Sequence, residues 1–386
     1  MFSERKDQAL FTYALKGSVR KEDDLQKIET LVKDGSFSKM VAETAADAAP
    51  EIAAGLLKTL KASAPSMLRE RSSLFRGFQA RLYRTWRRPL DLLEMLIVIA
   101  TESGEAFSDH WPWSKDKDQD LVFDVIRSLH ARGCQISEEI LTLLKAGFSS
   151  AAHARWRALH ETNVTAMFIA EHGRDTAERY LLHEHIESHK AALVYQKHHT
   201  AIRHPPMSKA ELDKQASMRD RLVAQYGKAF KSSYGWAAAA LQRIDEGVRF
   251  SDIEDSVKLD HLRPFYKMAS HPVHASSKAL SFRLELSPHQ RGPRHRLLLT
   301  GPSNLGLADP GHSAANSLSQ LTMTFITRRG TFDTIFASRL MLDLTEEIGD
   351  AFIETHKAVE ARTKANLRRR ARSARPRTRT ARPERG

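Results

Sequence analysis

Four side chains that could do chemistry lie within two turns of one helix-forming stretch. The segment from Gly147 to His199 contains Arg155, Arg157, His160 and Glu161. Histidine changes its charge near neutral pH and can supply acid and base, and arginine binds phosphate and other anions. The pattern predicts one of two arrangements. The side chains either line a pocket beside the core, or Arg157 and Glu161 form an ordinary i,i+4 ion pair on a helix surface.

Two long helices must position these side chains. The pattern predicts a break at His172-Gly173 and places the N-cap of the first helix at Ser149 or Ser150. Asn163 lies within a stripe of core-facing width, so its amide needs hydrogen-bond partners if that stripe is buried. The apolar members of the stripe are Trp156, Leu159, Ala166, Met167 and Ala170.

The second helix of this pair is rich in histidine. Two pairs of metal-ligating side chains are spaced i,i+4, namely His185 with His189 and His183 with Glu187. This spacing can hold a transition metal, and His160 or His274 could complete the ligand set. A solvated polar helix face explains the same pattern. The zincin motif is absent because it needs a histidine at the position of Glu187. We therefore predict no metal and no other cofactor.

Most of the remaining chain is predicted to be helical. Residues 1–75 are expected to form an N-terminal helical appendage, and residues 76–355 the main helical domain. Short apolar or alternating runs predict one β-hairpin near residues 282–300. The fold class is therefore all-α, a multi-helix bundle with a small β-hairpin insertion and a disordered basic C-terminal tail.

Local signals predict where individual helices begin and end. Pro65 is expected to break the first helical region, and Gly104 and Gly133 are expected to end helices. Ser208, three residues before Glu211, forms a capping box that predicts a helix to about Tyr226.

Composition limits the class of protein. At 386 residues and 41% hydrophobic content, the chain is long enough to bury a full core. The single Cys134 cannot form an intramolecular disulfide, which favours a reducing compartment, and no secretory signal is visible at the N-terminus. The most apolar run, Leu90 to Ala100, is too short for a membrane span. We therefore predict a cytoplasmic protein without a membrane partner.

Most of the positive charge lies at the C-terminal end. Residues 356–386 carry +10 of the net charge of +13. Such a segment has too little apolar content to form a core and predicts a disordered tail that attracts RNA, DNA or ribosomes. A merely solubilising extension explains the same composition. The arginines expected to contact nucleic acid are Arg368, Arg369, Arg370, Arg372, Arg375, Arg377 and Arg379.

The spacing Arg155-x-x-x-x-His160 resembles the motif of the HEPN superfamily. That superfamily comprises small helical bundles that include metal-independent ribonucleases of bacterial toxin and antiphage systems. The resemblance implies that His160 activates a ribose 2′-hydroxyl and that the arginine binds phosphate, at a homodimer interface. Trp156 departs from the polar residue that commonly follows the arginine in these nucleases.

A broader pattern resembles a bacterial family known only as a domain of unknown function, over about residues 80 to 345. It combines Trp86 and Leu90 to Gly104, Leu143-Leu144-x-x-Gly147, Arg155-x-Arg157-x-Leu159-x-Glu161, Arg179-Tyr180-Leu181, and Tyr266 with Ser270-x-x-Val273-His274-x-Ser276. The resemblance implies one shared polar site formed by Arg157, Glu161, Tyr180, Ser270, His274 and Ser276.

Three hypotheses about function remain open from the sequence. In the first, the protein is associated with nucleic acid as a ribonuclease. Its catalytic residues would then be His160, Arg155, Arg157, Glu161 and His274, and its substrate-binding residues Tyr180, Ser270 and Ser276. In the second, it is a non-catalytic interaction protein and the same polar residues hold the bundle together. A metal-dependent hydrolase is the third.

Overall fold

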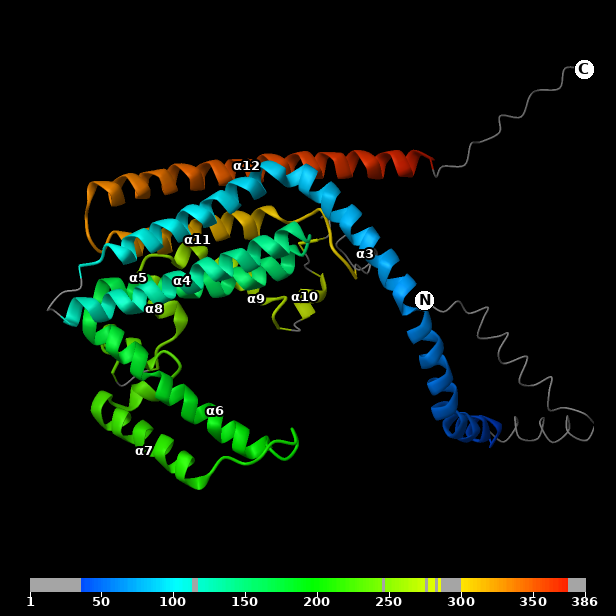
Figure 1. Cartoon of the computed structure of the whole chain (residues 1–386), viewed down its shortest axis with the longest axis horizontal. Helices are drawn as coiled ribbons and strands as arrows, with labels where there is room; N and C mark the ends of the chain where they lie inside the picture. The colour runs from blue at the N-terminus through cyan, green and yellow to red at the C-terminus, as the bar shows by residue number, and fades with distance from the viewer. Residues whose placement is uncertain are drawn as a thin grey trace, which may run out of the picture. The chain divides into compact units, whose positions relative to one another are not determined.

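The computed structural model describes residues 36–112, 117–244, 247–274, 277–281, 284–285 and 300–373. Within these residues the protein is all-α and contains no strand, which confirms the predicted class. The elements, shown in Figure 1, are α3 (Ser36–Asp109), α4 (Lys117–Lys145), α5 (Ser149–Leu182), α6 (Glu184–His198), α7 (Lys209–Tyr226), α8 (Phe250–Ser256), α9 (Arg263–Ser270), α10 (Ser277–Ser281), α11 (Ala308–Ile326) and α12 (Phe332–Ser373), with 3-10 turns η1 (Lys228–Lys231), η2 (Gly235–Ala237) and η3 (Asp260–Leu262).

The chain divides into two compact units, residues 1–77 and 78–386. The described part of the first unit is the N-terminal portion of α3. The portion of α3 in the second unit bends at Trp86, whose φ of −106° and ψ of 17° are not helical. Pro89 explains the bend, because proline lacks the N–H that would bond the carbonyl of Thr85 and its ring clashes with that carbonyl.

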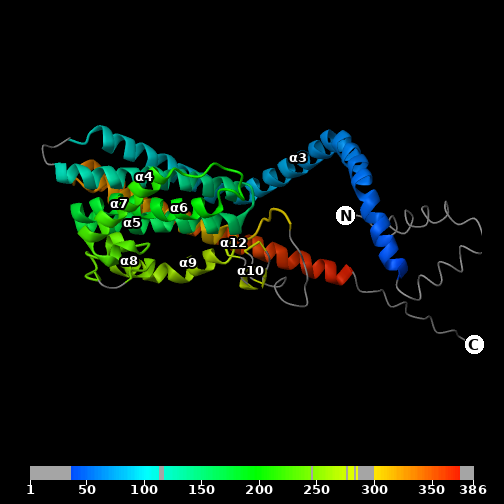
Figure 2. The same cartoon turned by 90° about the horizontal axis from the view of Figure 1, so that it is seen from below.

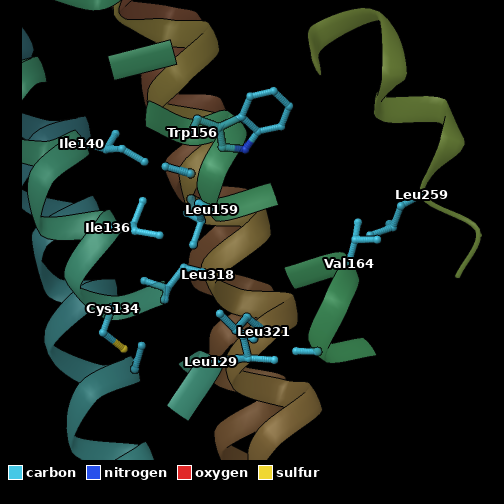
Figure 3. Close-up of a cluster of buried hydrophobic side chains, with 14 of the residues drawn as sticks. Leu129, Cys134, Ile136, Ile140, Trp156, Leu159, Val164, Leu259, Leu318 and Leu321 are labelled. Atoms are coloured by element: carbon cyan, nitrogen blue, oxygen red, sulfur yellow. The ribbon is translucent and has the colours of Figure 1, made fainter. Parts of the chain in front are cut away.

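The core of the second unit is a bundle in which α5 packs against α4 and α11, and α11 also packs against α4 and α12 (Figure 1). Figure 3 shows side chains from three of these helices meeting, among them Ile136 of α4, Leu159 of α5 and Leu318 of α11. Asn163 is fully buried, and its Nδ2 donates to Gln320 Oε1 at 2.7 Å. The stripe predicted on α5 therefore faces the core, and its polar member has a partner.

Short elements cover another part of α5. Both α8 and α9 pack against α5, and Figure 2 shows them one after the other along the bundle. The next pair of longer helices, α6 and α7, pack against each other. The capping of α7 follows the sequence prediction, since Ser208 accepts a hydrogen bond from Glu211 N at 3.2 Å.

Three of the predicted glycine and proline breaks are wrong. The helix α3 continues through Pro65 and Gly104, and α4 continues through Gly133. A Cβ on Gly133 would lie 2.2 Å from Leu321 Cδ2, so this glycine serves the close approach of α4 and α11. Gly173 is different: its φ of +72° interrupts α5 where a break was predicted, because glycine adopts this conformation without strain.

The N-cap predicted for α5 is also wrong. The cap position is Phe148, which makes no side-chain capping bond. Glu285, from a segment distant in the chain, accepts hydrogen bonds from Ser150 N at 2.8 Å and Ser150 Oγ at 2.6 Å. A carboxylate at a helix N-terminus satisfies free N–H groups and complements the helix dipole.

Two further predictions fall largely on residues that the structure does not describe. Of the β-hairpin expected near 282–300, the described residues Leu284 and Glu285 form a turn and show no strand. The tail was predicted to be disordered from residue 356, but α12 continues to Ser373. This part of the tail is helical because it extends an already formed helix, so no costly nucleation is required. Residues 374–386 lie outside the described residues.

No helix in the described ranges is long and apolar enough to cross a membrane.

Candidate functional site

A buried polar cluster joins α5 to the segment that contains α8 and α9. Nε2 of His160 lies 2.9 Å from Glu254 Oε1, and Arg263 Nε donates to Glu254 Oε2 at 2.8 Å. His160 is fully buried, and the side chain of Glu254 is 1% exposed. Arg263 also donates to the carbonyl of Ser251 at 3.1 Å and binds Asp255. We call His160, Glu254 and Arg263 the buried cluster.

The buried cluster keeps its carboxylate ionised. Burial alone would raise the pKa of Glu254, but the hydrogen bonds and charges of His160 and Arg263 outweigh it and hold the pKa below its usual 4.5. Glu254 is therefore an anion at neutral pH, with both oxygens occupied. Nδ1 of His160 has no hydrogen-bond partner among the described residues.

A second polar cluster lies beside the first and reaches solvent. Arg157 Nε donates to Glu161 Oε1 at 3.0 Å, and the hydroxyl of Tyr266 donates to the same oxygen. The guanidinium of Arg157 lies 4.7 Å from the centroid of the Tyr266 ring. Burial and the bond to Glu161 raise the pKa of Tyr266, so the phenol remains protonated. We call Arg157, Glu161 and Tyr266 the outer cluster.

Aromatic rings connect the two clusters. The rings of His160 and Tyr266 are 5.8 Å apart, and Phe250 stacks on Tyr266 at 5.1 Å. The ring of Trp156 also lies beside His160, with the ring centroids 5.3 Å apart. Both clusters therefore hold α8 and α9 against the same face of α5. Because His160 has no exposed surface, it cannot reach a substrate in this arrangement.

Arg155 does not join either cluster. Its Nε donates to Glu139 on α4, so it points to a different neighbour from His160. Arg155 and His160, the two residues of the HEPN-like spacing, therefore have different partners. Arg155 bonds Glu139 at the α4–α5 contact, and His160 bonds Glu254 in the buried cluster.

The remaining predicted site residues are not brought together either. The ring of Tyr180 packs edge-on against Trp236 at 5.1 Å, and Ser270 Oγ donates to the carbonyl of Tyr266 in its own helix. His274 is exposed in the turn after α9. Ser276 lies outside the described residues. Of the predicted shared site, the side-chain contacts among the described residues unite only Arg157 and Glu161, and Ser270 and His274 are joined only through their backbone, at 3.1 Å.

Sequence reasoning missed Glu254 and Arg263 as site residues. It used Tyr266 only to mark a resemblance and gave it no role. Glu254 stands in the short acidic stretch of α8, and nothing in its spacing distinguishes it from Asp252 or Asp255. Only its burial and its contact with a residue on α5 reveal its role.

Two of the histidines in the predicted metal-binding pattern, His183 at the N-cap of α6 and His189 within α6, bind other parts of the protein. Nε2 of His183 lies 2.8 Å from the carbonyl of Ser232, and Nε2 of His189 accepts from Arg219 at 2.8 Å. Burial and the charge of Arg219 lower the pKa of His189. Across the ranges that the structure describes, no three His, Cys, Asp or Glu side chains are grouped to hold a metal ion.

A positively charged groove lies between α3 and α12. Its volume is about 480 Å³. Its lining residues, all described, include no carboxylate; they are Arg81, Arg84, Thr85, Thr355, Ala358, Val359 and Arg362. Sequence reasoning placed the basic surface only in the C-terminal tail, because the arginines of α3 are remote from it in the chain. We call this feature the basic groove.

These features define an all-α helical-bundle protein with two polar clusters on one face of its central helix. Residues 123–291, which contain both clusters, match a family described as "Family of unknown function (DUF5677)". This confirms the predicted resemblance to such a family over a shorter range than the expected 80 to 345. No curated protein and no solved structure matches the chain. The comparisons do not show the resemblance to the HEPN superfamily.

Proposed function

We propose that this protein associates with nucleic acids by binding their phosphate backbone in the basic groove. The observation that carries the proposal is the convergence of three arginines from α3 and α12 on a groove without an acidic lining residue. Arginine binds phosphate through a planar fork of donors, and the hydroxyl of Thr355 adds a further donor, whereas that of Thr85 donates to the carbonyl of Arg81 at 3.0 Å. Such contacts bind the backbone and read little sequence.

The arginines of the groove are not neutralised by neighbouring carboxylates. Among the described residues, the side chains of Arg81 and Arg362 have no ion-pair partner, and Arg84 donates only to the carbonyl of Ala80. Arg88, one turn further along α3, is by contrast paired with Glu347 and Glu354. The groove therefore offers cations that remain available to a polyanion.

Positive charge continues along α12 beyond the groove. Lys357, Lys364, Arg368 and Arg369 are exposed on this helix, and the chain after them is also rich in arginine. Each neutralised phosphate releases counterions, so several such contacts give tight binding at low salt. The sequence-predicted arginines of the tail would add to the same electrostatic attraction.

The two polar clusters favour a structural role over ribonuclease activity. A general acid or base must come within hydrogen-bonding reach of the proton that it transfers. His160 is buried and bonded to Glu254, and Arg155 is bound to Glu139. We propose that these residues stabilise the bundle and that binding takes place elsewhere. The homodimer implied by the HEPN resemblance stays a prediction.

Fluorescence anisotropy tests the proposal. Labelled single-stranded RNA and an unrelated sequence of the same length are titrated with protein at several salt concentrations. The triple variant Arg81→Gln, Arg84→Gln, Arg362→Gln should bind both more weakly. The slope of log K against log salt should become shallower by about 2, because about 0.7 counterions are released per single-strand phosphate.

A charge-matched variant controls for non-specific attraction. Arg132→Gln, Arg174→Gln and Arg221→Gln remove the same charge from exposed positions on α4, α5 and α7. Equal loss of affinity in the two triple variants would reject the groove as the binding site. Cleavage of the RNA that disappears in His160→Ala would instead support the ribonuclease hypothesis.

A further inference from the structure

A pocket chemically different from the basic groove lies between α3 and the turn that joins α11 to α12. Its volume is about 360 Å³, at the lower end of the range of small-molecule sites. Its apolar wall consists of Ala106 and Phe107 of α3, Ile326 of α11 and Ala337 of α12. Phe107 packs edge-on against Phe325, with the ring centroids 5.1 Å apart, so this wall is continuous with the core. The pocket shares no residue with the basic groove.

Two opposite charges line this pocket. Besides the ring of His110, the charged side chains among its described lining residues are one cation, Arg329, and one anion, Asp333. These two side chains do not pair with each other, and neither has a partner among the described residues. Further along α12, by contrast, Arg339 and Asp343 bind each other at 2.6 Å. The pocket therefore offers a ligand one charge of each sign.

The turn that carries both charges is held by reciprocal hydrogen bonds. Thr331 Oγ1 accepts from Thr334 N at 3.3 Å, and Thr334 Oγ1 accepts from Thr331 N at 3.0 Å. The hydroxyl of Thr334 also donates to the carbonyl of Thr331 at 2.9 Å, and Thr334 is buried. These bonds cap α12 and fix the backbone on both sides of Asp333. A wall that is fixed before binding lowers the entropy cost of binding.

Two further hydrogen-bonding side chains of α3 line the pocket. Nδ1 of His110 lies 2.7 Å from the carbonyl of Ala106, so Nδ1 donates there and Nε2 is the ring atom left for a ligand. The hydroxyl of Ser103 makes no hydrogen bond among the described residues. Both side chains add hydrogen-bonding groups to a cavity that already holds a cation and an anion.

The two charges select among ligands of this size. A purely anionic ligand would pair with Arg329 and meet a like charge at Asp333, and a purely cationic ligand would do the reverse. A zwitterion gives each of these side chains an opposite charge to bind. An apolar group on the same ligand would be removed from water against Phe107.

We propose that this pocket binds a small zwitterion with an apolar side chain, of the class of a hydrophobic α-amino acid. The ligand carboxylate accepts from Arg329, and the ligand ammonium donates to Asp333. The apolar side chain lies against Phe107 and the neighbouring wall of α3. Binding here is separate from nucleic-acid binding in the basic groove.

Three probes that differ only in charge test this preference. L-phenylalanine carries both charges, N-acetyl-L-phenylalanine keeps the carboxylate alone, and L-phenylalaninamide keeps the ammonium alone. Each is added at millimolar concentration to the full-length protein at about pH 6, where α-amino groups are protonated. Saturation-transfer NMR and isothermal calorimetry measure binding. We expect L-phenylalanine to bind most tightly.

Variants of the protein locate the bound probe. Arg329→Gln should weaken L-phenylalanine and its N-acetyl derivative by about fivefold and should not weaken the amide, because the amide has no carboxylate. Asp333→Asn should weaken L-phenylalanine and the amide by about fivefold and should not weaken the N-acetyl derivative. Ala106→Phe should weaken all three probes by filling the pocket.

A second charge pair on the same helix supplies matched controls. Arg339→Gln and Asp343→Asn make the same chemical changes on α12, and neither residue lines the pocket. Both variants should bind the three probes as the wild type does. Melting curves of each variant establish that it is folded.

Reciprocal losses in Arg329→Gln and Asp333→Asn, without losses in the controls, would support the proposal. Either singly charged probe binding as tightly as L-phenylalanine would overturn it, as would equal effects of the controls or no binding of any probe. RNA binding by Ala106→Phe should be unchanged, so failure here is distinguishable from failure of the basic-groove proposal.

Discussion

Glu254 gives the most direct test of the structural role of the buried cluster. In Glu254→Gln the side chain keeps its shape and loses its charge. The carboxylate of Glu254 meets His160 through one oxygen and Arg263 through the other. In glutamine one of these oxygens remains as a neutral acceptor for Arg263, and the other position becomes an NH2 group that His160 Nε2 can meet only as an acceptor. Each such change costs about 1 to 1.5 kcal/mol, and solvent screens part of the Arg263 contribution because that side chain is 30% exposed. We expect the free energy of unfolding to fall by about 2 kcal/mol.

The neighbouring Asp255 supplies a matched control. Its carboxylate binds the same Arg263, but its side chain is 53% exposed, compared with 1% for Glu254. Asp255→Asn should therefore cost less than about 1 kcal/mol, as exposed ion pairs do. Urea denaturation followed by circular dichroism at pH 7 measures both variants. Equal m-values would establish that the comparison concerns stability alone.

The pH dependence provides a second readout. The folded pKa of Glu254 lies below the usual 4.5, so the unfolded chain takes up this proton at a higher pH than the folded protein. The stabilisation by Glu254 is present above 4.5 and is lost as the pH falls through the folded value. The difference in unfolding free energy between the wild type and Glu254→Gln should therefore shrink as the pH falls from 4.5 through the folded pKa of Glu254. A loss no larger than that of Asp255→Asn, or one that does not shrink on acidification, would refute the reasoning.

Two other predictions concern buried groups of the bundle. Burial lowers the pKa of His153 from 6.5 to about 4, so the unfolded chain binds this proton first and stability falls as the pH drops through that window. His153→Phe should reduce the slope of unfolding free energy against pH by up to about 1.4 kcal/mol per unit, and an unchanged slope in urea titrations would contradict this. Gly133→Ala should destabilise by about 1 to 3 kcal/mol because its Cβ meets Leu321, whereas Gly55→Ala, with open space around it, should not destabilise. Thermal or urea unfolding of the two variants distinguishes these outcomes, and equal effects would argue against the close helix contact.

Features that depend on neighbouring residues in the chain were predictable. The all-α class followed from helical periodicity, and the start of α7 followed from the Ser208 cap. The interruption at Gly173 followed from the freedom of glycine to adopt positive φ. The Arg157–Glu161 bond was also expected, since residues at i,i+4 meet on any helix.

Features that depend on distant partners were not predictable. Gly133 looks like a helix end in the sequence, but it is the contact point of α4 with α11. Pro65 looks like a break, but the helix continues through it. The N-terminus of α5 is satisfied by Glu285 instead of its own serines. A residue type and its neighbours in the chain do not reveal whether a glycine ends a helix or lets two helices approach closely. They also do not reveal whether a serine or a distant carboxylate caps a helix.

The sequence by itself determined the helical class, the charge excess of the C-terminal end and the local pairing on α5. Tertiary structure alone decided that His160 is buried in contact with Glu254 and that Arg155 bonds Glu139 of α4. It also decided that arginines of α3 and α12 meet in one groove. The physical reason is that helix periodicity specifies which face is buried, whereas burial, pKa and charge depend on which helix covers that face.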